Sequence, residues 1–177
     1  DWIHTSKAEE LVSHTILSSL TKKRIGIAHH RGASRYAPEN TLPCLQRSLN
    51  LGADFVEFDV RTTSDHNLVL LHDGSLDRTT TGIGPIKANS LAELRRLDAG
   101  SWFGPAYQST PIPTMDEFLD GFDRKTELYI DAKDIDPEQL VAVLKRHKMT
   151  ERACVYQGPD YLMRLMEVDP EIRRMPA

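Results

Sequence analysis

The chain has 177 residues, of which 40% are hydrophobic and 27% are charged, as in an ordinary globular domain with its own core. Its formal net charge of −4, from 22 basic and 26 acidic residues, argues against a nucleic-acid-binding surface. No apolar run is long enough to span a membrane, and two distant cysteines, Cys44 and Cys154, do not make a disulfide framework.

The first half of the chain alternates short apolar segments with helix-like segments, a pattern that predicts a parallel α/β sheet. A helix is expected over residues 6–20, where Ser6 and Glu9 form a capping box and apolar residues recur at helical spacing. A strand over residues 24–30 and a helix over residues 40–52 are expected next.

Two strands, over residues 53–61 and 67–73, are predicted before a long irregular section. That section covers about residues 74–113, is rich in Thr, Gly and Pro, and holds one short helix with a capping box in Ser90 and Glu93. A segment of this length is too long for an ordinary loop, and such insertions are often functional.

The alternation of strands and helices continues to the C-terminus. A capping box in Thr114 and Glu117 opens another helix. The later elements are, in chain order, a strand at 127–133, a helix starting at Asp136 and Pro137, a strand at 153–158, a helix at 159–168 and a strand beginning in 171–177.

The predicted strand over residues 53–61 carries Glu57 and Asp59 among the apolar residues of its centre. Alternate residues of a strand share a face, so Glu57 and Asp59 lie on one side, about 7 Å apart. Asp131 has the same setting in the strand over residues 127–133. Three such carboxylates repel one another unless a divalent cation lies between them, and oxygen ligands suit Mg²⁺ or Ca²⁺. The alternative is a set of salt bridges to the nearby cations Arg31, Arg61 and Lys133.

Polar residues also end each of the first four predicted strands. In a parallel barrel these ends meet at one face, and that face carries the active site. The set comprises His29, His30, Arg31, Glu57, Asp59, Arg61, His72, Asp73, Asp131, Lys133 and Asp134. Among them His30 and His72 are suited to proton transfer near neutral pH, whereas Asp73 has the alternative role of orienting a turn. A nucleotide-binding Rossmann fold is disfavoured, because no G-x-G-x-x-G follows the first predicted strand.

Four long motifs resemble those of the glycerophosphodiester phosphodiesterase family. They are "HRGASRYAPENT" (30–41), "VEFDVRTTSDHNLVLLHD" (56–73), "LDRTTTGIGPI" (76–86) and "LDAGSWFGPAYQSTPIPTMDEFL" (97–119). The resemblance implies an α/β TIM-type (β/α)8 barrel with a small insertion after strand three. It also implies hydrolysis of small-molecule glycerophosphodiesters to glycerol 3-phosphate and an alcohol, with a divalent metal that is often Ca²⁺ or Mg²⁺.

The same resemblance implies a role for individual residues. Glu57 and Asp59 resemble the family's metal ligands, and His30 and His72 resemble its acid–base histidine pair. The phosphate-contacting cations of the family match Arg31 and Lys133, and Glu39 matches a further polar residue at the substrate site. At the third metal position the family usually has Glu, whereas this chain has the shorter Asp131, as in related sphingomyelinase D-type enzymes.

The chain is short for a complete barrel, which takes about 250 residues. We therefore expect residues 1–177 to form one C-terminally incomplete barrel domain of about six strands, with the insertion at 74–113, and to belong to a longer protein. Because the chain begins at Asp1 and not at Met, a periplasmic or secreted location and a cytoplasmic one both stay open, as does the oligomeric state.

Two other functions stay open beside the expected one. The first is a lipid phosphodiesterase of the sphingomyelinase D or lysophospholipase D type, which the Asp at position 131 suggests. The second is a non-catalytic barrel that binds a phosphorylated ligand. In the insertion, Trp102, Phe103 and Tyr107 either line the pocket for the alcohol or pack the insertion onto the barrel.

Overall fold

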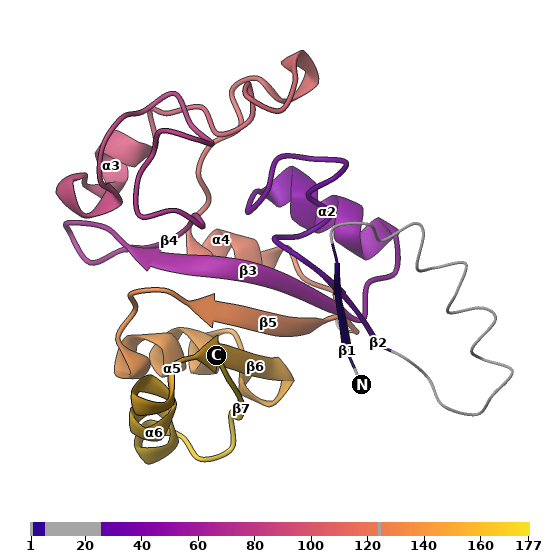
Figure 1. Cartoon of the computed structure of the whole chain (residues 1–177), viewed down its shortest axis with the longest axis vertical. Helices are drawn as coiled ribbons and strands as arrows, with labels where there is room; N and C mark the ends of the chain where they lie inside the picture. The colour runs from indigo at the N-terminus through magenta and orange to yellow at the C-terminus, as the bar shows by residue number, and fades with distance from the viewer. Residues whose placement is uncertain (1, 6–25, 124) are drawn as a thin grey trace, which may run out of the picture.

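The structure, a computed structural model, describes residues 2–5, 26–123 and 125–177. Its strands form one sheet in the order β1-β2-β3-β5-β6-β7, in which all neighbours are parallel, and β4 pairs antiparallel with β3 (Figure 1). The strands are β1 Trp2–Thr5, β2 Gly26–His29, β3 Phe55–Thr62, β4 Leu68–Leu70, β5 Glu127–Ala132, β6 Ala153–Gln157 and β7 Arg173–Pro176.

Helices follow most of the parallel strands, as expected of a β/α repeat. They are α2 Leu42–Asn50, α3 Leu91–Leu94, α4 Met115–Asp120, α5 Pro137–Arg146 and α6 Pro159–Val168, with short 3-10 turns at η2 Ile86–Ala88, η3 Pro105–Tyr107 and η4 Thr150–Arg152. The helix predicted over residues 6–20 lies outside the described residues. None of the described helices is long and apolar enough to cross a membrane, and both cysteines are free thiols.

The predicted helix starts are confirmed by their hydrogen bonds. The side chains of Ser90 and Thr114 each accept a hydrogen bond from the backbone N–H of the Glu three residues later. Each Glu carboxylate in turn accepts one from the backbone N–H of the capping residue, which completes both capping boxes. Asp136 caps α5 by accepting a hydrogen bond from the backbone N–H of Glu138.

One predicted barrel strand is wrong. The strand expected over residues 67–73 is β4, which runs back along the end of β3 as an antiparallel partner and is not one of the parallel strands. The physical reason is the short connection. Only the residues between Thr62 and Leu68 join the two strands, whereas a parallel crossover needs about a dozen residues or more. In addition, β1 was not expected.

The main core lies between one face of the sheet and its helices. Val56, Phe58 and Val60 of β3 point into it, as their alternation predicts, and all three are fully buried. Phe58 packs on Phe118 of α4 with ring centroids 5.0 Å apart. The opposite face of the same strands is therefore left for Glu57 and its polar neighbours.

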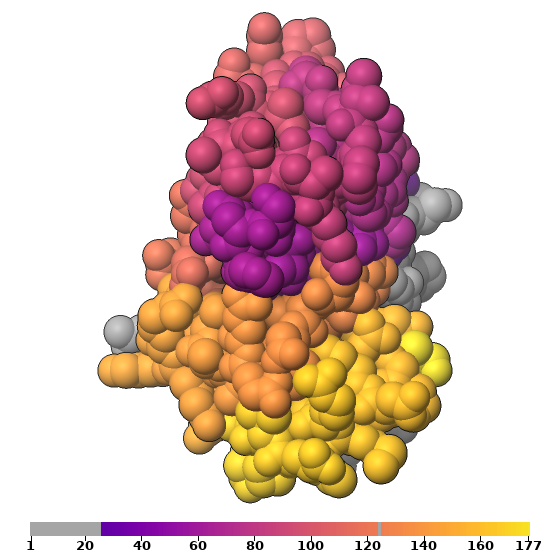
Figure 2. All heavy atoms as spheres, turned by 90° about the vertical axis from the view of Figure 1, so that its left-hand side faces the viewer, coloured from indigo at the N-terminus to yellow at the C-terminus, as the bar shows by residue number. Residues whose placement is uncertain are grey.

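The insertion over residues 74–113, which lies between β4 and α4 and is here called the cap, contributes to a small second core. In Figure 1 the cap lies on the side of the sheet to which the arrowheads of β3 and β5 point. Figure 2 looks at that side and shows the cap above the C-terminal third of the chain. The strand β4 joins the two cores, because Leu68 and Leu70 belong to the main one whereas Val69 and Leu71 belong to that of the cap.

Candidate active site

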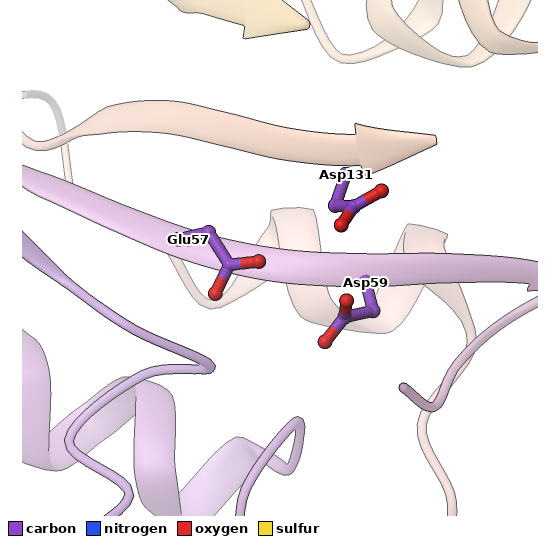
Figure 3. Close-up of side chains that lie close together, drawn as sticks. All are labelled: Glu57, Asp59 and Asp131. Carbon is purple, nitrogen blue, oxygen red and sulfur yellow. The ribbon is translucent and has the colours of Figure 1, made fainter. Parts of the chain in front are cut away.

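Three carboxylates from two adjacent strands lie together at the centre of the sheet (Figure 3). The parallel register places Asp59 beside Asp131 and Glu57 beside Tyr129. Each of the three acids offers one oxygen atom, and these oxygens all lie within 4.8 Å of one another. Glu57 and Asp59 are 3% and 0% exposed, so their charges are held away from bulk water.

The loop that follows β2 folds over Glu57. The backbone N–H of Arg31 donates to Glu57 Oε2 at 2.5 Å, and the N–H of Gly32 donates to the Glu57 carbonyl at 3.0 Å. Both loop residues have positive φ angles, of 53° and 77°. Glycine is needed at position 32, because a Cβ there would lie 2.7 Å from Cys44 Sγ. The turn at Arg31 and Gly32 therefore shapes the backbone around Glu57, a predicted metal ligand.

Asn40 is a site residue that the sequence reasoning missed. Its side-chain Nδ2 donates to Asp59 Oδ2 at 2.8 Å, and its Oδ1 accepts from the Asp59 backbone N–H at 3.0 Å. Asn40 is 1% exposed and adopts a φ of 57°, a left-handed conformation that Asn tolerates better than most residues. The two bonds fix the orientation of the Asp59 carboxyl group.

Two cations adjoin the carboxylates. Lys133 Nζ lies 2.5 Å from Asp131 Oδ2 and 3.3 Å from Asp59 Oδ1. Desolvation by itself lowers the pKa of Lys133, but the bond to Asp131 and the charge of Asp59 outweigh it, and the pKa is raised. The second cation is Arg31, whose Nε lies 3.8 Å from Asp59 Oδ2.

The donor set fits a hard divalent cation. All the candidate ligand atoms are carboxylate oxygens, which Ca²⁺ and Mg²⁺ prefer. Two oxygens on opposite sides of Ca²⁺ lie about 4.8 Å apart, given Ca–O distances near 2.4 Å, so the observed spread suits a single ion. Asp59 Oδ1 is buried and accepts no well-aligned hydrogen bond from the described residues, although Lys133 Nζ lies 3.3 Å away as an ion-pair partner. The shorter side chain of Asp131 still reaches this cluster.

The two histidines follow β2 and β4, the strands that pair with β3, and they have different settings. His30 follows β2 directly and leads into the Arg31 turn, and its side chain is half-buried. His72 follows β4, and its Nδ1 lies 2.7 Å from Asp73 Oδ1. The His72 carbonyl accepts two hydrogen bonds from the Arg61 guanidinium, at 2.9 and 2.6 Å.

The aromatic residues of the cap pack on one another. Phe103 makes edge-on contacts with Trp102 and Tyr107, at ring-centroid distances of 5.6 and 5.4 Å. The Tyr107 hydroxyl donates to the Tyr36 carbonyl at 2.6 Å and so joins the cap to the loop after β2. Trp102 remains 42% exposed.

Comparison with known proteins gives a consistent picture. Residues 30–162 match the model of the glycerophosphoryl diester phosphodiesterase family. A glycerophosphodiester phosphodiesterase of Bacillus subtilis is 40% identical over 143 residues, which cover 73% of this chain and 49% of that protein. One from Caldanaerobacter subterraneus is 37% identical over 142 residues, or 76% of this chain and 58% of that protein. The chain thus spans about half the length of these curated relatives.

Solved structures share the fold. A glycerophosphodiester phosphodiesterase from Agrobacterium tumefaciens superposes with a TM-score of 0.80 at 36% identity, over 85% of this chain and 65% of that one. A phosphodiesterase from Oleispira antarctica, in complex with the product sn-glycerol-3-phosphate, gives a TM-score of 0.76 at 35% identity, over 84% of this chain and 64% of that one. The parallel strands described above are therefore part of the wall of a TIM-type (β/α)8 barrel.

Proposed function

The chain belongs to the glycerophosphoryl diester phosphodiesterase family, and we propose that it hydrolyses glycerophosphodiesters to glycerol 3-phosphate and an alcohol. The observation that carries this proposal is the cluster of Glu57, Asp59 and Asp131 with the cations Lys133 and Arg31 next to it. A phosphodiester is anionic, so a site for it needs positive charge close to the groups that move protons. The product named for the Oleispira antarctica neighbour is the one proposed here.

Glu57, Asp59 and Asp131 would hold a Ca²⁺ or Mg²⁺ ion. When bound, such an ion supplies Lewis-acid chemistry by neutralising charge on a non-bridging phosphate oxygen. The protein prepares the site by fixing two of the carboxylates in advance, through the Arg31 backbone N–H and the Asn40 side chain. This support reduces the reorganisation needed on binding.

Arg31 and Lys133 bind the other phosphate oxygens in this proposal. The planar guanidinium of Arg31 suits a forked contact, whereas the Lys133 ammonium acts as a point charge. Glu39 contributes to substrate binding by holding Arg31, since its Oε1 accepts from Arg31 Nη1 at 3.1 Å.

His30 and His72 transfer the protons. One imidazole removes the proton from the attacking oxygen and the other protonates the leaving alkoxide, roles that histidine commonly takes in general acid–base catalysis. The attacking oxygen belongs to water or to a glycerol hydroxyl of the substrate, which would form a cyclic phosphate first.

The test measures glycerol 3-phosphate released from glycerophosphocholine by the full-length protein, with Mg²⁺, with Ca²⁺ and with EDTA. We expect release that depends on metal and is lost in EDTA. His30→Ala and His72→Ala should each lower kcat by roughly 10²-fold or more without unfolding the protein. Absence of release with either metal, or a double variant that turns over normally, would overturn the proposal.

A lipid phosphodiester is the second candidate substrate, in the manner of sphingomyelinase D or lysophospholipase D. Two features favour it: Asp131, where the family resemblance leads us to expect Glu, and Trp102 on the cap, which is exposed. Choline release from sphingomyelin or lysophosphatidylcholine vesicles, with no release from glycerophosphocholine, would select this substrate class.

A further inference from the structure

Arg78, on the cap, bridges two acids that belong to different loops of the site. Its Nε and Nη2 donate to the two oxygens of Asp73, at 2.6 and 3.2 Å. Its Nη1 and Nη2 donate to the two oxygens of Glu39, at 3.0 and 2.7 Å. A guanidinium is the side chain that can make two such forked contacts at once, because its donors lie in one rigid plane.

Asp73 connects Arg78 to His72, because its carboxylate contacts both side chains. The hydrogen bond from Arg78 is the largest of the effects that lower the pKa of Asp73. Asp73 is therefore an ionised acceptor at neutral pH. Its Oδ1 lies 2.7 Å from His72 Nδ1, and a carboxylate in that position holds the imidazole proton on Nδ1. The Nε2 of a neutral His72 is then left to accept a proton.

Glu39 connects Arg78 to Arg31, the cation proposed to contact the phosphate. Burial raises the pKa of Glu39, but its hydrogen bonds with Arg78 and the charge of Arg31 outweigh burial and lower it. Glu39 is therefore ionised and accepts a hydrogen bond from Arg31 as well. The result is a row of alternating charges, Arg31, Glu39, Arg78 and Asp73, that ends at the His72 imidazole and in which Arg78 is the one member from the cap.

We propose that Arg78 is a positioning residue for the reaction, which fixes the tautomer and orientation of His72 through Asp73 and ties both site loops to the cap. The inference rests on the proposed function for its kinetic consequence, since it assigns His72 the proton transfer. The arrangement itself does not depend on turnover. On this account the cap is part of the catalytic support, in addition to being a cover beside the site.

The first experiment uses the full-length protein and compares Arg78→Met with wild type. Loss of a group that orients another commonly costs about 10- to 100-fold, so we expect kcat to fall by that factor while KM changes less. Arg78→Lys keeps the charge but not the two forks, and should recover part of the loss. Arg95→Met is the matched control, because Arg95 is also on the cap and pairs with Glu117, outside the row of charges.

A double-mutant cycle with Asp73→Asn separates positioning from a general effect on structure. If Arg78 acts through Asp73, then Arg78→Met should lower kcat by less than about 3-fold in the Asp73→Asn background. Equal losses in both backgrounds, or an Arg78→Met enzyme as active as the Arg95→Met control, would overturn the inference.

A second readout does not need activity. The ¹⁵N shifts of the His72 ring, recorded where the ring is neutral, should show mainly the Nδ1–H tautomer in wild type and a mixture in Arg78→Met. An unchanged tautomer would refute the inference even if the enzyme acted on another substrate. If Arg78→Met does not fold, Arg78→Lys provides the same comparison.

Discussion

Replacing Asn40 with Ala removes the support of a buried carboxylate. The change deletes a hydrogen bond to the charged Asp59 side chain, worth about 1.5–3 kcal/mol, and leaves the Asp59 N–H without its acceptor, at about 1–3 kcal/mol. Alanine at a φ of 57° costs about another 1–2 kcal/mol. The lower ends of these ranges already give a loss of about 3.5 kcal/mol in the free energy of unfolding.

The assay is urea unfolding of the full-length protein, with Asn50→Ala as the control. Asn50 is exposed at the end of α2, and the same substitution there should change stability by less than about 0.5 kcal/mol. Because Asn40 orients Asp59, calorimetry should also show about 10- to 100-fold weaker binding of Ca²⁺ or Mg²⁺ to Asn40→Ala. A loss of stability below about 1 kcal/mol, less than a third of the expected value, would refute the reasoning about the buried pair.

Further changes test other features of the structure. Glu57→Gln should abolish binding of Ca²⁺ and Mg²⁺ measured by calorimetry, and an unchanged affinity would rule out the cluster as a metal site. Gly32→Ala should lower the melting temperature more than Gly52→Ala. Both have positive φ, but a Cβ at position 32 would lie 2.7 Å from Cys44 Sγ whereas one at position 52 would meet no atom within 4 Å, and equal losses would contradict this. Burial lowers the pKa of His29 from 6.5 to about 4, so the unfolded chain binds a proton between these pH values and the folded chain does not. Stability should therefore fall by up to about 3 kcal/mol as the pH drops from 6.5 to 4, and this dependence should disappear in His29→Leu; if it persists, another group is its source.

Much of the fold could be predicted because local signals agree with the final packing. The helix over 159–168 has the predicted bounds, and both capping boxes form. The strand β4 was misjudged because its apolar run resembles that of a parallel barrel strand. The short link from β3 is the signal that would have identified a hairpin.

The candidate site was predictable where function needs particular residue types at the ends of strands. Glu57, Asp59 and Asp131 form the expected cluster because strand alternation and parallel register are simple rules. Asn40 and Arg78 were not predicted as support, since their partners lie 19 and 39 residues away at Asp59 and Glu39, through loops that no periodicity describes.

The two-sided strand β4 has a consequence for exchanging parts between relatives. A cap is naturally taken to begin where the irregular section begins, after Asp73. Yet Val69 and Leu71 already belong to the apolar cluster of the cap, whereas Leu68 and Leu70 belong to that of the barrel. A chimera joined after Asp73 would combine the cap of a relative with this chain's own β4. The cap-facing side chains Val69 and Leu71 would then pack against a core to which they are not matched. The graft should start in the turn before Leu68, with the barrel-facing leucines kept from the host.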